Sequence, residues 1–196
     1  MANDTFVMTA RQSAELDYAF ERNGVTPKDV KWLSEGSNAA IVRQVRLGFV
    51  EVKPVNTFAL TVNYNRSIEQ SVKAGKYDWA NDSINAKHFP SQTKGMAEVE
   101  IILVKFEKDM ESDDVVKQLD EQGLRPAELE ELLAFGEKYS DVQRNFPVVA
   151  LGSVWQNPYG NRYVPDLFGG TGERWLGLDW WSLRWNSYCR FAAVRK

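Results

Sequence analysis

Cysteine and histidine are the scarcest chemically reactive residues of this chain. Its 196 residues include a single cysteine, Cys189, and a single histidine, His88. One cysteine excludes an internal disulfide, and one histidine excludes a histidine-rich metal site. We interpret His88, in the sequence NAKHFP, as an ordinary loop residue. Cys189 precedes an apparent strand, and we interpret it as a small core residue.

The sequence also has little excess charge and no long hydrophobic run. Its 24 basic and 27 acidic residues give a net charge of -3, without the basic footprint of a nucleic-acid-binding protein. The N-terminal MANDTFVMTARQ lacks the basic and apolar regions of a signal peptide, and no stretch approaches the ~20 apolar residues of a membrane span. We therefore expect a soluble chain made in the cytoplasm, without a signal peptide, that binds no nucleic acid and spans no membrane.

Common catalytic motifs are absent as well. The glycine-rich 169–173 segment, GGTGE, lacks the lysine and the strand-to-helix context of a phosphate loop. The acidic 109–121 segment lacks the alternating oxygen ligands and central glycine of a calcium loop. Gly152-Ser153 is not part of a G-x-S-x-G nucleophile motif. The sequence thus indicates no catalytic residue, metal or cofactor, and we predict that the chain is not an enzyme.

Residues 1–48 are predicted to be a helical N-terminal segment. A first helix is expected over Thr9–Arg22, with Thr9 as its N-cap, and a second begins at Pro27 and ends at Gly36. Residues 37–46 are expected to form a third. Short helices joined by tight turns could form a DNA-reading helix-turn-helix, but these offer few basic side chains for phosphate contacts. We interpret them as an appendage or docking module.

Strand patterns begin near Phe49. FVEVK, at 49–53, is a plausible strand, and Thr57–Tyr64 alternates with apolar residues on one face. Ser67 opens a capping box and a short helix that Gly75 ends. Residues 97–106, AEVEIILVKF, are apolar enough in the middle to form a strand buried on both faces.

Two helices are expected next. Ser112 is placed to cap a helix over Asp113–Glu121. A second helix is expected to have Pro126 at its first position and to run to about Tyr139, with a stripe of leucines buried. Its acidic residues are interpreted as a solvated face: Glu128, Glu130, Glu131 and Glu137.

The sequence that follows this helix predicts short strands and turns. Residues 166–172, with three glycines, are expected to form a loop, and Arg174–Leu178 and Arg190–Arg195 are expected to be strands joined by a loop at 179–188. Four of the seven tryptophans lie in the last 24 positions of the sequence, interleaved with small and polar residues: Trp175, Trp180, Trp181 and Trp185. We interpret this mixture as an apolar frame that supports a polar face. The alternative is a strand pair whose tryptophans are all core and whose polar residues are ordinary turns.

The order of these elements resembles a known family. A GLRPAEL stretch at 123–129 introduces a helix, short strands rich in glycine and tryptophan follow, and RFAAVR ends the pattern at 190–195. This order resembles the C-type lectin fold, in the branch shared by formylglycine-generating enzymes and the variable proteins of diversity-generating retroelements. The resemblance covers about residues 97–196. It implies an α+β domain at 49–196, with short antiparallel strands, two helices and a variable region at about 173–190.

In such variable proteins, adenines of a template repeat are replaced at random during reverse transcription, whereas tryptophan has an adenine-free codon and stays fixed. The resemblance therefore implies that Trp175, Trp180, Trp185 and Phe191 are scaffold, while Trp181 is fixed but adjoins the variable face. The ligand-binding residues implied in this way are Gly177, Asp179, Trp181, Ser182, Leu183, Arg184, Asn186, Ser187 and Tyr188.

The implied function is recognition of varied protein or glycan ligands by a monomer without a metal or cofactor. The enzyme branch uses a pair of cysteines, and this chain has only Cys189. Two alternatives remain open: an enzyme on the formylglycine-generating-enzyme-like fold, and a phage structural or assembly protein.

Overall fold

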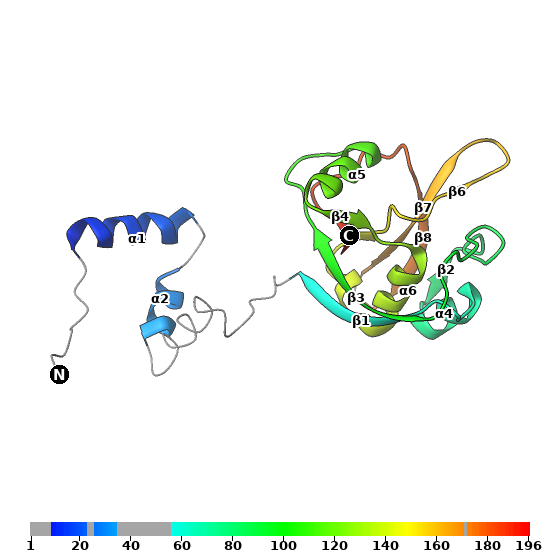
Figure 1. Cartoon of the computed structure of the whole chain (residues 1–196), viewed down its shortest axis with the longest axis horizontal. Coiled ribbons are helices and arrows are strands. Elements are labelled where there is room, and N and C mark those ends of the chain that lie inside the picture. Colours follow the sequence, from blue (N-terminus) through cyan, green and yellow to red (C-terminus); the bar gives the residue numbers. More distant parts are fainter. Residues whose placement is uncertain (1–8, 23–25, 35–55, 171) are drawn as a thin grey trace. The chain divides into compact units, whose positions relative to one another are not determined.

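A computed structural model describes residues 9–22, 26–34, 56–170 and 172–196. The chain divides into two compact units, Met1–Lys53 and Pro54–Lys196 (Figure 1). The domain boundary expected at 48/49, the helix expected at 37–46 and the strand expected at 49–53 lie outside the described residues.

The first unit contains the two helices expected from its capping signals, α1 (Ala10–Arg22) and α2 (Pro27–Ser34). The Thr9 hydroxyl accepts a hydrogen bond from the Gln12 amide at 3.3 Å, while the Thr9 amide donates to Gln12 Oε1 at 2.9 Å. This reciprocal pair confirms Thr9 as the cap. Within the described ranges, none of the helices is long and apolar enough to cross a membrane.

The second unit is built on a nine-stranded sheet with the order β1-β3-β9-β5-β7-β8-β2, in which β4 also pairs with β9 and β6 with β7 (Figure 1). The strands are β1 (Thr57–Asn63), β2 (Trp79–Ala80), β3 (Met96–Val104), β4 (Leu124–Pro126), β5 (Val148–Val149), β6 (Trp155–Gln156), β7 (Arg162–Gly169), β8 (Arg174–Trp180) and β9 (Arg190–Arg195). The helices are α4 (Ile68–Gly75), α5 (Ser112–Glu121), α6 (Leu129–Lys138) and the 3-10 helix η1 (Val142–Arg144). The mixed α and β class is confirmed. The strands were expected to be antiparallel, but two pairings are parallel: β5 with β9, and β2 with β8.

Strand β9 separates two hydrophobic cores. Successive side chains of a strand point to opposite faces. Ala192 and Val194 therefore join α6 in one core, and Phe191 and Ala193 join α5 in the other. The second half of β3 likewise contacts both cores, but the strand expected to be buried on both faces is buried only on the face of Ile101 and Leu103, since Ile102 and Val104 are half-buried.

Arg174, the first residue of β8, is a buried cation that ties several elements together. Its guanidinium donates to the carbonyl oxygens of Gly75 at 2.7 Å and Gly136 at 2.6 Å. It also donates to Gln143 Oε1 at 3.0 and 3.2 Å. Gly75 is the last residue of α4, and Gly136 lies in the last turn of α6. Because the helix dipole makes these ends electronegative, two helix C-termini stabilise one buried positive charge.

The start of α6 and the segment before it correct two expectations. Pro126 does not begin a helix but belongs to β4, which pairs with β9, and α6 begins at Leu129. Glu131 is fully buried rather than on a solvated face. Its carboxylate accepts hydrogen bonds from the Arg125 guanidinium at 2.6 and 2.9 Å, from Tyr64 Oη at 3.0 Å and from the Glu128 amide at 2.7 Å. These four donors compensate for its burial.

We predict that Arg174→Met lowers the free energy of unfolding by about 3 kcal/mol or more, because each buried acceptor left without a donor costs about 1–3 kcal/mol. Urea unfolding followed by tryptophan fluorescence measures the loss. Arg66→Met is the matched control, since Arg66 forms a partly exposed ion pair with Glu137 and such pairs contribute about 0–1 kcal/mol. Equal losses in the two variants would contradict the role of Arg174.

Candidate functional site

A pocket of about 440 Å³ lies between the β7–β8 hairpin and residues 181–189, which join β8 to β9 and are here called the rim loop. Its walls come from β2, β7, β8 and the rim loop. The lining residues are Trp79, Asn81, Pro147, Asp166, Phe168, Gly177, Leu178, Asp179, Leu183, Arg184, Trp185, Asn186 and Cys189. Of the residues implied by the family resemblance, the pocket gathers Gly177, Asp179, Leu183, Arg184 and Asn186.

The register of β7 and β8 forms the pocket floor. Asp166 lies opposite Gly177, and Val164 lies opposite Asp179, so the two acidic residues are diagonal neighbours on one face. A Cβ atom at Gly177 would lie 2.6 Å from Asp166 Oδ1 and 2.7 Å from the Phe168 ring. Gly177 therefore lines the pocket by leaving space for the Asp166 carboxyl group, rather than by offering a side chain to a ligand.

Asp166 is the most perturbed titratable group of this floor. Asp166 is 4% exposed, and its Oδ1 atom has no hydrogen-bond partner among the described residues. Burial, followed by the nearby charge of Asp179, raises the pKa of Asp166 to about 8. Burial also raises the pKa of Asp179, which is half-buried. At neutral pH the floor thus holds a proton that a nearby cation would displace.

The rim loop is fixed to the residues around the start of α5. Trp185 is 2% exposed, and its indole Nε1 donates to Ser112 Oγ at 2.9 Å. Ser112 Oγ in turn donates to the Trp181 carbonyl at 2.6 Å, and the Trp185 backbone exchanges two hydrogen bonds with Met110. Ser112 was expected to be an N-cap, but Glu111 holds that position, because the Ser112 hydroxyl is engaged with the rim loop.

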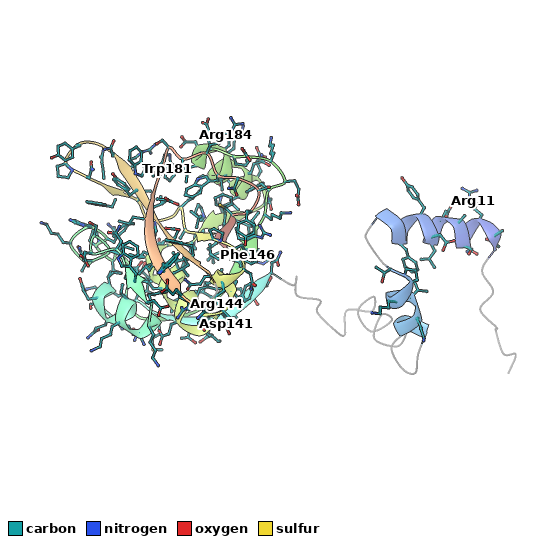
Figure 2. The ribbon with its side chains drawn as sticks, turned by 180° about the vertical axis from the view of Figure 1, so that it is seen from behind. Arg11, Asp141, Arg144, Phe146, Trp181 and Arg184 are labelled. Atoms are coloured by element: carbon teal, nitrogen blue, oxygen red, sulfur yellow. The ribbon has the colours of Figure 1, made fainter. Side chains whose placement is uncertain are left out.

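The outer side chains of the rim loop are solvent-exposed: Ser182, Leu183, Arg184, Asn186 and Tyr188. Ser187 is half-buried, as is Trp181, whose ring lies 4.6 Å from the Arg162 guanidinium. Figure 2 shows Trp181 and Arg184 at the end of the unit that carries α5. Trp181, Ser182, Ser187 and Tyr188 do not line the pocket.

Two exposed residues of the rim loop also support its backbone. Asn186 Oδ1 accepts a hydrogen bond from the Tyr188 amide at 2.9 Å, which closes a local turn. The Tyr188 hydroxyl donates to the Asn145 carbonyl. Asn186 and Tyr188 therefore combine exposure with a structural contact, whereas no such side-chain hydrogen bond is seen for Ser182 in the described part of the chain.

The expected tryptophan frame is only partly present. Trp185 is buried, and Trp175 and Trp181 are half-buried. Trp180 is 55% exposed and is therefore not a buried member of this frame. It lies on the face of β8 opposite to Asp179, where its ring makes an edge contact with Tyr163 at 6.0 Å.

Sequence reasoning missed Asp166. The three glycines of 166–172 suggested a loop, but β7 continues to Gly169. No polar/apolar alternation marks this strand, because Val164 and Phe168, on the face of Asp166, are as apolar as Leu167 on the other face. Trp79 and Asn81 were also missed, because they reach the pocket only through the pairing of β2 with β8.

The remaining reactive residues lie apart from one another. Cys189 is buried at the pocket, where burial and then the Asp166 and Asp179 charges raise the pKa of its thiol. His88 lies in a turn, stacks on Trp155 at 4.4 Å and contacts the Ser83 carbonyl at 3.0 Å through Nδ1. Across the residues with described positions, no three His, Cys, Asp or Glu side chains group closely enough to hold a metal ion.

Comparison of the chain with protein-family models, with curated proteins and with solved structures finds no match.

The raised pKa of Asp166 predicts a pH-dependent stability. Between its ordinary value of 3.8 and about 8, the folded state retains a proton that the unfolded state releases. The free energy of unfolding therefore falls as the pH rises through this window, relative to a variant without the carboxyl group. We predict that Asp166→Asn has nearly wild-type stability at pH 4 and becomes progressively more stable than wild type up to pH 8.

Urea unfolding at one-unit pH steps from 4 to 9 measures this difference. Asp141→Asn is the control, because the Asp141 side chain is 90% exposed and does not line the pocket. A constant difference between wild type and Asp166→Asn at every pH would show that Asp166 is ionised in the folded protein.

Proposed function

We propose that this chain is a non-enzymatic ligand-binding protein of the kind diversified by retroelements, with a C-type-lectin-like domain over about residues 49–196. The observation that carries the proposal is the construction of the rim loop. Its centre is fixed by the buried Trp185, while the neighbouring Ser182, Leu183 and Arg184 are exposed beside a pocket.

A binding surface tolerates many substitutions only when its backbone is held by residues outside the variable set. Here the holding contacts come from Trp185, whose codon contains no adenine, and from Met110 and Ser112, which precede the variable region. The backbone is therefore ordered before a ligand arrives, and this lowers the entropic cost of binding. The exposed polar side chains next to these contacts are free to change.

The structure narrows the proposed contact set. Gly177 cannot be replaced without a clash with Asp166, so we assign it to the scaffold of the site. The proposed contact residues are Asp179, Ser182, Leu183, Arg184, Asn186 and Tyr188. Tyr188 and Asn186 are expected to tolerate fewer replacements than 182–184, because each makes a supporting hydrogen bond.

The lectin-like assignment is supported by the arrangement of the second unit. Strand β9 pairs antiparallel with β3, and the strands that carry the proposed binding face, β7 and β8, form an antiparallel hairpin. Two helices, α5 and α6, pack against the cores on either side of β9. This combination agrees with the two helices and short strands that the resemblance implies.

Sequencing the locus tests the retroelement origin. We expect a near-copy of the codons for residues 173–190 that differs from them almost only at adenines, next to a reverse-transcriptase gene. The codons for residues 97–120, which lie outside the proposed variable region, serve as the control and should have no such copy. If neither stretch has a copy, the diversification proposal is wrong.

Substitutions in the rim loop test its tolerance. The combined variant Ser182→Ala, Leu183→Ala, Arg184→Ala should change the free energy of unfolding by less than about 1.5 kcal/mol, since exposed substitutions each change it by within about 0.5 kcal/mol. Trp185→Ala, one position further, should cost about 3–5 kcal/mol because it empties a buried site. Urea unfolding measures both. Comparable losses would show that the exposed positions are part of the scaffold, contrary to the proposal.

A further inference from the structure

We infer that the pocket beside the rim loop receives a cationic side chain, the ammonium of lysine or the guanidinium of arginine, from a protein ligand. This inference rests on the proposed binding function and specifies its ligand. It commits to a protein rather than a glycan, because proteins carry these groups on most of their surfaces and common neutral sugars carry none.

The first support is the unpartnered floor of the pocket. Asp166 is buried, lines the pocket, and its Oδ1 atom has no hydrogen-bond donor among the described residues. Leaving a buried acceptor without a donor costs about 1–3 kcal/mol. An ammonium group offers three donors and a guanidinium five, so either could satisfy Oδ1 and still bond to Asp179. The missing partner is thus of the type that a basic side chain supplies.

The second support is the charge around Asp166. The titratable and charged groups that face the pocket are Asp179 on β8, the Cys189 thiol before β9 and Arg184 on the rim loop. The Arg184 side chain is 71% exposed, and its Nε lies 4.0 Å from a carboxylate oxygen of Asp109, outside the pocket. Solvent therefore screens the attraction between Arg184 and the pocket acids, and Arg184 also interacts with Asp109. The floor is left with two acidic groups and no buried cation among the described residues that line it.

The third support is the apolar wall. Trp79, Phe168 and Leu183 also line the pocket that contains the two acidic groups. Methylene stems of lysine and arginine pack on apolar surfaces while their charged ends reach polar groups, and aromatic faces attract cations. A volume of about 440 Å³ is ample for one long side chain. The combination of apolar walls and an acidic end matches the amphipathic form of these residues.

A divalent metal ion is the competing occupant. Calcium takes six to eight oxygen ligands. The described part of the chain contains no group of three or more potential acidic, histidine or cysteine ligands. Two carboxyl groups suit a single hydrogen-bonding cation better, and the test includes the metal as an outcome.

The affinity of the pocket for such a cation should increase as the pH rises. In the free pocket the Asp166 pKa is about 8, so binding at pH 6 requires loss of a proton. A lysine ammonium, with an ordinary pKa of about 10.4, remains charged up to pH 9. Affinity should therefore rise up to about tenfold per pH unit from pH 6 to 8 and level off above it.

The experiment titrates the full chain with Nα-acetyl-lysine N-methylamide and with its arginine counterpart, followed by NMR chemical shifts at pH 6, 7, 8 and 9. The norleucine counterpart, which is neutral and of similar length, is the control ligand. We expect the cationic probes to bind at least about tenfold more tightly than norleucine at pH 8, a difference of about 1.4 kcal/mol in binding free energy. Their affinity should also follow the pH dependence described above.

Asp166→Asn tests the role of the floor carboxyl group. This variant should stay folded, as its NMR spectrum would show, yet bind the lysine probe about tenfold more weakly at pH 8 and lose the pH dependence. Asp141→Asn, at an exposed acid outside the pocket, should bind as wild type does.

Three results would overturn the inference: no binding of either cationic probe at millimolar concentration, equal binding of the norleucine probe, or calcium binding that displaces the cationic probes. Failure of the proposed function would look different. Absence of a template repeat would leave probe binding intact, whereas absence of probe binding would leave the template repeat and the tolerance of residues 182–184 unaffected.

Discussion

Burial of the Arg174 guanidinium is the constraint on which the second unit depends. A buried cation is costly unless polar groups surround it. Here the carbonyl oxygens at the ends of α4 and α6 and the side chain of Gln143 provide that surrounding. Gln143 also donates to the carbonyl oxygens of Phe168 and Trp175, which belong to β7 and β8. Two helices and two strands are therefore joined through the hydrogen-bonded side chains of Arg174 and Gln143, and β8 has a fixed starting point.

The candidate site lies between this fixed point and a second one. From Arg174, strand β8 runs beneath the pocket and carries Gly177 and Asp179 opposite β7. Beyond the strand, Trp185 and Ser112 hold the rim loop against the residues around the start of α5. The site thus combines a buried acidic floor with a rim loop that Trp185 anchors and that exposes Ser182, Leu183 and Arg184. On the proposed function, this division would allow one surface to offer both a preformed pocket and positions open to substitution.

Local signals predicted local structure, and long-range contacts decided the rest. The capping box at Ser67 and the alternation within residues 57–64 were read correctly, because each depends on neighbours in the sequence. Pro126 was misread, since pairing with β9 outweighs its preference for a helix start. Glu131 was misread because Arg125 and Tyr64 compensate for its burial only in the folded chain. In the site, composition indicated the rim loop, but the sheet register that buries Asp166 left no local pattern.

The bonds that define this unit join residues far apart in the sequence. Arg174 and Gly75 are separated by 99 positions, and Trp185 and Ser112 by 73. Such topologies fold slowly, because a long loop must close before its contacts can form. During that search the tryptophan-rich β8 is unpaired and open to association with other chains. Substitutions at residues 182–184 remove none of these contacts. Variants that differ only at these three positions should therefore share the same kinetic barrier to folding and spend the same time unfolded.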